Sequence, residues 1–198
     1  PLYSSAASDV YKRQLLTFAF EEATGFTFLK IGLCYKQLSL YKQAIRYFTK
    51  ACHEDPQLSE AWMEIGLCYD AKGSSEEGLH YIKKALNLNP DDLEYIYIQT
   101  KIYRKIGLFD EAILGYQKLI DLNCDSPNLW MEFAFLKKEI NESKDAIHIL
   151  KSAVKIHKNN VDLLFRLGAY LFLDNQLEKA SIYLQKANAL DSTSVSYT

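Results

Sequence analysis

Residues 59–92 read SEAWMEIGLCYDAKGSSEEGLHYIKKALNLNPDD, and this stretch predicts one helical hairpin. Its apolar residues recur every three or four positions on both sides of residues 73–75 (GSS), as in two amphipathic helices joined by a turn. Pro90 ends the second helix. The pattern also occurs one period upstream, because residues 31–35 (IGLCY) recur as residues 65–69. The chain therefore repeats a helical hairpin every 34 residues.

Five such hairpins account for most of the chain. Each is expected to pack its two helices through small residues, such as Gly66 on a first helix and Ala44 on a second. The third hairpin has Thr100 in the glycine position, and the fourth has Lys137 in an aromatic position. One hairpin cannot bury its apolar face alone, so stacked neighbours must supply the core. The repeats span residues 25–58, 59–92, 93–126, 127–160 and 161–194.

A 34-residue helical hairpin with these small and aromatic positions resembles the tetratricopeptide repeat. The resemblance implies an all-α fold, a right-handed superhelical solenoid of antiparallel helix-turn-helix repeats whose first helices line a concave groove. Polar capping repeats are usual at the ends of such arrays, and neither end of this sequence shows one. We therefore expect residues 15–198 to form a single solenoid domain, truncated at both ends.

Residues 4–14 (SSAASDVYKRQ) match nothing in the repeat pattern and resemble a translated sequencing adapter. We therefore expect residues 1–14 to be a non-native segment, and the chain to be a bacterial fragment. A polar arm and a signal peptide are the alternatives, although the charged start and apolar core of a signal peptide do not occur here in that order. Residues 15–24 form either the tail of a preceding helix or a backward extension of the next one.

Composition excludes several classes of protein. A chain of 198 residues with net charge −2 and 48% hydrophobic residues has the composition of a soluble globular protein. Nucleic-acid binding would require a basic surface, so the net charge of −2 argues against that function. No apolar run approaches the roughly 18 residues that span a bilayer. The cysteines form no CxxC pair and are expected to be buried and reduced, which favours the cytoplasm. They are Cys34, Cys52, Cys68 and Cys124.

No motif indicates catalysis, a cofactor or a metal. The chain lacks a phosphate-binding loop, a nucleophile elbow and a zinc-protease motif. Its histidines, such as His80 and His148, lack ligand spacing and are expected on the surface. Acidic pairs such as Glu76-Glu77 suit the first turn of a helix. We therefore expect a protein that is not an enzyme and holds no cofactor.

One position on the first helices is large and apolar in all five repeats. We call its residues the apolar row: Leu29, Met63, Tyr97, Met131 and Phe165. In the family it faces the groove, and an exposed apolar stripe marks an interaction site. In a tight superhelix the same row would instead pack between repeats, and both interpretations stay open. Phe135 lies one turn further on, and Lys101 and Arg104 would add polar contacts. The predicted partner contacts are Leu29, Met63, Tyr97, Lys101, Arg104, Met131, Phe135 and Phe165.

These features predict a protein–protein or protein–peptide interaction scaffold that binds a partner segment in the concave groove. The family's Lys/Asn clamp for chaperone C-termini is absent, because Leu29, Leu33 and Met63 are among the residues in the groove positions. In one alternative the repeats recruit substrate for a larger enzyme or sensor, such as a glycosyltransferase or signalling kinase, whose catalytic part lies outside the fragment. In another, uncapped ends drive self-association.

Overall fold

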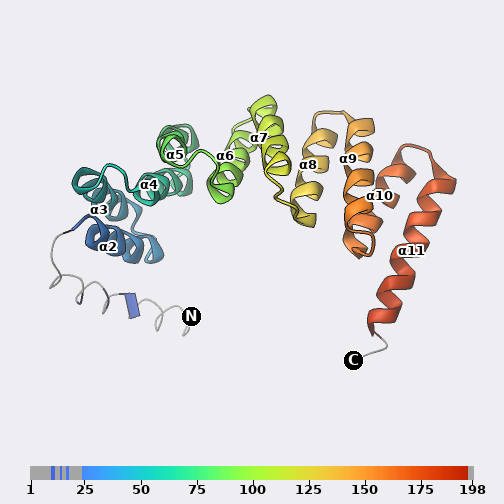
Figure 1. Ribbon diagram of the computed structural model, residues 1–198, viewed down its shortest axis with the longest axis horizontal. Coiled ribbons are helices and arrows are strands. Elements are labelled where there is room, and N and C mark those ends of the chain that lie inside the picture. Colours follow the sequence, from blue (N-terminus) through green and yellow to red (C-terminus); the bar gives the residue numbers. More distant parts are fainter. Residues whose placement is uncertain (1–9, 12–13, 15–16, 18–23, 196–198) are drawn as a thin grey trace. The chain divides into compact units, whose positions relative to one another are not determined.

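The computed structural model describes residues 10–11, 14, 17 and 24–195, with side chains as far as residue 191. From Gly25 to Val195 the described chain forms ten α-helices and no strand (Figure 1). The chain divides into two compact units, Pro1–Leu108 and Phe109–Thr198, and each is described by itself. The predicted all-α helix-turn-helix fold is confirmed.

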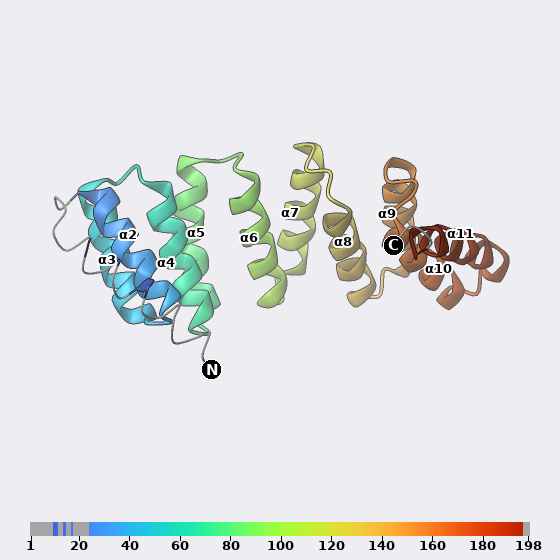
Figure 2. The ribbon, with the colours of Figure 1, turned by 90° about the horizontal axis from the view of Figure 1, so that it is seen from below.

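The helices follow the 34-residue period in both units. In the first unit, α2 to α5 lie side by side as two antiparallel pairs (Figure 2). The first helices of the five repeats begin at residues 25, 59, 93, 127 and 161, and the boundary between units falls inside the third repeat. The first unit contains α2 (Gly25–Gln37), α3 (Tyr41–Glu54), α4 (Ser59–Ala71), α5 (Ser75–Leu88) and α6 (Leu93–Lys105). The second contains α7 (Phe109–Asp121), α8 (Pro127–Glu139), α9 (Ser143–Ile156), α10 (Val161–Leu173) and α11 (Leu177–Val195).

Each first helix ends in the same turn. The second residue after the end of the helix has a positive φ. The backbone N–H of the next residue donates to a carbonyl five residues earlier, as in Leu40 N to Tyr35 O at 2.9 Å. This is the geometry of a Schellman motif, which favours glycine or asparagine. After the first helices the positive-φ residues lie one period apart, at Ser39, Gly73, Gly107, Asn141 and Asn175, and Asn123 after α7 is a further one.

Helix crossings depend on small residues, as the sequence indicated. A Cβ on Gly78 would lie 2.5 Å from the carbonyl oxygen of Gly66, so the backbones of α4 and α5 touch. A Cβ on Gly32 would collide with the ring of Phe48. Thr100 replaces this glycine in α6, where it is buried and its hydroxyl donates to Ile96 O at 2.7 Å.

Lys137 takes the aromatic position of the fourth repeat without leaving its charge unpaired. Its ammonium lies 2.5 Å from Glu142 Oε2 and 3.9 Å from Asp145 Oδ2, and only 15% of its side chain is exposed. Two carboxylates therefore compensate the cation at the position where the first three repeats have a tyrosine. This explains how the most divergent repeat keeps its hairpin.

The thiols behave largely as predicted. Cys34, Cys52 and Cys68 are buried and free, whereas Cys124 is free and half-buried. Burial raises the pKa of Cys52 to about 12 and that of Cys68 to about 11, so both thiols stay protonated at neutral pH. They pack as small apolar groups rather than as nucleophiles.

Most of the N-terminal segment lies outside the described residues. Of residues 4–14, only Val10, Tyr11 and Gln14 are described, so the adapter interpretation stays a prediction. The Thr24 hydroxyl accepts the N–H of Thr27 at 3.2 Å and caps α2, which therefore begins at Gly25. In the described part of the chain, no helix is both long and apolar enough to cross a membrane.

Candidate partner-binding surface

The first two members of the predicted apolar row, Leu29 and Met63, are buried. Leu29 is 1% exposed and Met63 is 3% exposed. Leu29 joins a core cluster with Ala61 and Ile65 of the next first helix, α4. Met63 likewise packs with Ile102 of α6. Because each of these side chains is covered by the following repeat, the prediction that they are exposed anchors is wrong.

Two ion pairs join successive first helices of the first unit. Lys36 Nζ of α2 lies 2.5 Å from Glu64 Oε2 of α4, and Lys105 Nζ of α6 lies 2.7 Å from Asp70 Oδ1 of α4. Burial raises the pKa of the Glu64 carboxyl, although the neighbouring Lys36 ammonium partly opposes that shift. Successive first helices are thus joined by compensated charges as well as by apolar packing.

The other predicted contacts of the first unit lie on α6. Tyr97 is half-buried, and the Lys101 ammonium lies over its ring, 5.3 Å from the centroid. Lys101 is exposed and Arg104 is half-buried. A role for these three residues in binding a partner stays a prediction.

The first helices of the second unit remain open. Phe135 of α8 is 44% exposed and Phe165 of α10 is 59% exposed, although both are large and apolar. Met131 of α8 is half-buried against the core of the unit. The structure adds Phe172, which is 59% exposed and lies two helical turns after Phe165. The seven-residue spacing between Phe165 and Phe172 was the sequence signal that could have placed both on one face of α10.

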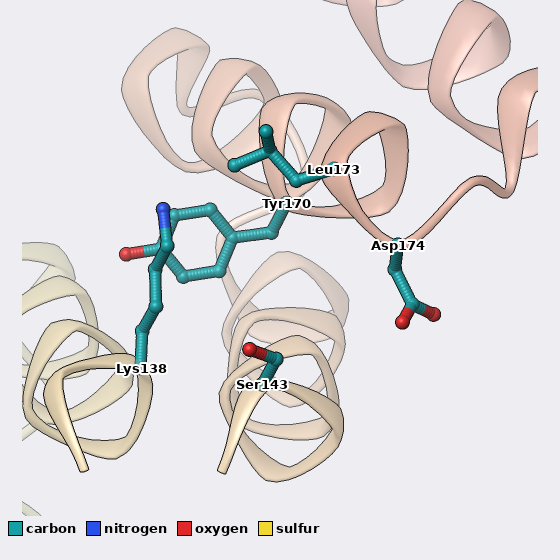
Figure 3. A pocket seen from close by; sticks show the side chains of 5 residues that line it. All are labelled: Lys138, Ser143, Tyr170, Leu173 and Asp174. Carbon is teal, nitrogen blue, oxygen red and sulfur yellow. The ribbon is translucent and has the colours of Figure 1, made fainter. Parts of the chain in front are cut away.

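A small cavity lies between α8, α9 and α10, and its residue Lys138 is three positions after Phe135 on α8 (Figure 3). Its volume is about 90 Å³. The Lys138 ammonium lies over the ring of Tyr170, 4.6 Å from its centroid. Burial raises the pKa of the Tyr170 hydroxyl, which therefore stays protonated at neutral pH. The lining residues are Lys138, Ser143, Tyr170, Leu173 and Asp174.

Polar groups in this cavity are unevenly arranged. The Ser143 hydroxyl faces the side where Lys138 and Tyr170 meet, whereas Asp174 lies on the far side with its carboxylate turned away (Figure 3). Asp174 Oδ2 also accepts a hydrogen bond from Gln176 Nε2 at 2.6 Å. One end of the cavity therefore offers a cation and two hydroxyl groups. Within the described residues, no group of three or more His, Cys, Asp or Glu side chains is placed to hold a metal.

Two stretches of the chain, residues 27–58 and 59–92, each match the family model of the tetratricopeptide repeat. Residues 27–92 therefore consist of two tetratricopeptide repeats. The helices keep the same 34-residue spacing as far as α10 and α11. None of the curated proteins matches the sequence.

Solved structures share the fold of this chain. The crystal structure of MamA has a TM-score of 0.75 at 20% identity, covering 89% of this chain and 97% of MamA. MamA from Desulfovibrio magneticus RS-1, residues 41 to the end, has a TM-score of 0.69 at 14% identity, covering 85% and 96%. YrrB, described as a TPR protein with an unusual peptide-binding site, has a TM-score of 0.66 at 15% identity, covering 92% and 93%. At these identities the likeness establishes the fold.

Proposed function

We propose that the chain is a protein-interaction scaffold. Its second unit would bind a partner segment on the face formed by the first helices α8 and α10. The observation that carries this proposal is the exposure of Phe135 and Phe165 on the neighbouring first helices α8 and α10. Exposed aromatic side chains lose water on binding without having to leave a packed core. The equivalent face of the first unit is already filled by its own side chains.

A peptide is the class of ligand that suits such a face. Rows of first helices present side chains at regular intervals, so an extended or helical segment can contact several repeats. YrrB, which has the same fold, is described as having a peptide-binding site, and this supports the same class of ligand here. Half-buried Met131, one helical turn before Phe135 on α8, would adapt its shape to the partner.

Selection from a random peptide library displayed on phage tests the proposal. The intact chain should enrich peptides whose affinity falls about tenfold or more in a Phe135→Ser/Phe165→Ser variant, because each truncation removes apolar contact area. Circular dichroism would first establish that the variant keeps its helical content.

Phe26→Ser provides the matched control. Phe26 lies on α2 in the first unit and is 58% exposed, nearly the same as Phe165. Its replacement should leave affinity for the selected peptides unchanged. Failure to enrich any peptide, or equal binding by the double variant, would contradict the proposed function.

A further inference from the structure

The ion pair that closes the first unit has a like-charged counterpart in the second. Lys138 lies three repeats after Lys36, and Arg166 lies three repeats after Glu64. Glu64 neutralises Lys36 at 2.5 Å, whereas the equivalent position beside Lys138 carries a second cation. The second unit therefore has an excess of positive charge where the first has none.

The structure shows how this excess is accommodated. Among the described residues, Lys138 is paired with the Tyr170 ring and with no carboxylate. Arg166 lies close enough to the Tyr170 hydroxyl to act against the rise in its pKa that burial causes. A cation held over an aromatic face keeps its outer side available for an anion. The cavity thus combines positive charge with hydroxyl donors.

The size of the cavity limits what it can accept. About 90 Å³ holds a few water molecules or one carboxylate group, but not a folded segment. Asp174 on the far side would repel a doubly charged phosphate more strongly than a singly charged carboxylate. Leu173, which is 66% exposed, offers apolar surface beside the polar end.

We infer that this cavity binds the carboxylate of an Asp or Glu side chain in the partner segment, with an apolar partner residue against Leu173. The inference rests on the proposed function and names the chemistry of the partner. Lys138 forms the ion pair, and the hydroxyl groups of Tyr170 and Ser143 donate hydrogen bonds to the carboxylate. The partner segment is therefore acidic next to an apolar residue.

The peptides selected on phage provide the probe. Peptides fused to the coat protein through their C-termini carry no free terminal carboxylate, so any enriched acid is a side chain. We expect enrichment of Asp or Glu beside Leu, Ile or Phe. An amidated synthetic copy of the best peptide would then be titrated calorimetrically, together with a copy in which Gln or Asn replaces the acid.

A double-mutant cycle isolates the proposed contact. Lys138→Gln should weaken the acidic peptide about tenfold, as expected for loss of a charge-assisted hydrogen bond at a half-buried site. The same variant should bind the amide peptide as the unmodified chain does. Tyr170→Phe should produce a smaller loss, also confined to the acidic peptide. Lys36→Gln in the first unit is the matched control and should change neither affinity.

Arg166→Glu offers an independent test, because it rebuilds the charge arrangement of Lys36 and Glu64 around Lys138. It should weaken the acidic peptide at least as much as Lys138→Gln does. Selected peptides that need Phe135 and Phe165 but contain no acid, or an acidic peptide that Lys138→Gln binds unchanged, would overturn this inference and leave the proposed function intact. The absence of any selected peptide would overturn both.

Discussion

The second and fourth repeats place methionine at the same position of the first helix and use it differently. Met63 is 3% exposed and packs against Ile102, whereas Met131 is half-buried, and Phe135 and Phe165 of the same unit are exposed. The difference comes from the neighbours rather than from the residue. In the first unit the next first helix covers the row and compensating charges join the helices. In the second, rings stay exposed and Lys138 lies next to another cation in the repeat register.

One repeat pattern therefore holds buried side chains in one unit and exposed ones in the other. In the first unit Leu29 and Met63 are buried between repeats. In the second unit Phe135 and Phe165 are exposed. Four comparisons test that distinction. Each is assessed by urea unfolding followed by tryptophan fluorescence. Trp62 in a Trp130→Phe background reports on the first unit, and Trp130 in a Trp62→Phe background reports on the second. The chain has two tryptophans, one in each unit.

The largest expected effect is that of Met63→Ala. Truncating a buried methionine removes apolar contacts and leaves a cavity, so the free energy of unfolding of the first unit should fall by about 2–5 kcal/mol. Met131→Ala should lower that of the second unit by only about 1 kcal/mol, because its side chain is half-buried. Equal losses at the two positions would contradict the contrast between a closed and an open row.

Gly78→Ala comes next. The new Cβ would meet the Gly66 carbonyl oxygen at 2.5 Å and force α4 and α5 apart, so the first unit should lose about 1–3 kcal/mol. At an uncrowded helix position the same change would stabilise the protein. Ala146→Gly is the equivalent position in the fourth repeat and should cost about 1–2 kcal/mol, because it lowers helix propensity and removes a buried methyl group. A more stable Gly78→Ala variant would show that the backbones do not touch.

Glu64→Arg converts the charge arrangement of the first unit to that of the second. It removes the partner of Lys36 and adds a like charge at a site only 13% exposed, so the first unit should lose about 1–2 kcal/mol. The reciprocal Arg166→Glu should leave the second unit unchanged or more stable by less than about 1 kcal/mol. Denaturation midpoints that move in the opposite directions would break the proposed equivalence of the two pairs.

The smallest effect concerns pH. Because burial raises the pKa of Glu64 in the folded state, folding favours its protonated form. Its contribution to the free energy of unfolding is therefore complete below its unfolded pKa and declines as pH rises through the folded pKa. Comparing the chain with Glu64→Gln at a series of pH values from 4 to 7 isolates this contribution. The stability of the unmodified chain relative to the variant should decrease over the series, and an increase would show that the Lys36 ion pair outweighs burial.

Local features of the fold were readable in the sequence. Helix spacing, the crossing glycines Gly66 and Gly168, and the 34-residue period all follow from short-range sterics that recur in every hairpin. The turns after the first helices were readable too, because Gly73, Gly107 and Asn141 suit a positive φ, but Ser39 hid this regularity. Lys137 was recognisable as divergent, whereas its two carboxylate partners appeared only once the turn was formed.

The candidate binding surface could be read only in part. The sequence identified the row that contains Met63, Met131 and Phe165, but it did not determine which members are buried. Burial depends on the side chains that the next helix places opposite, and those lie about 34 residues away in the chain. The sequence by itself therefore determined the repeat and the positions that face its neighbours. Only the tertiary structure decided that the first unit fills those positions, while the second leaves its phenylalanines and the Lys138 cavity open, because packing and charge compensation are properties of pairs of helices.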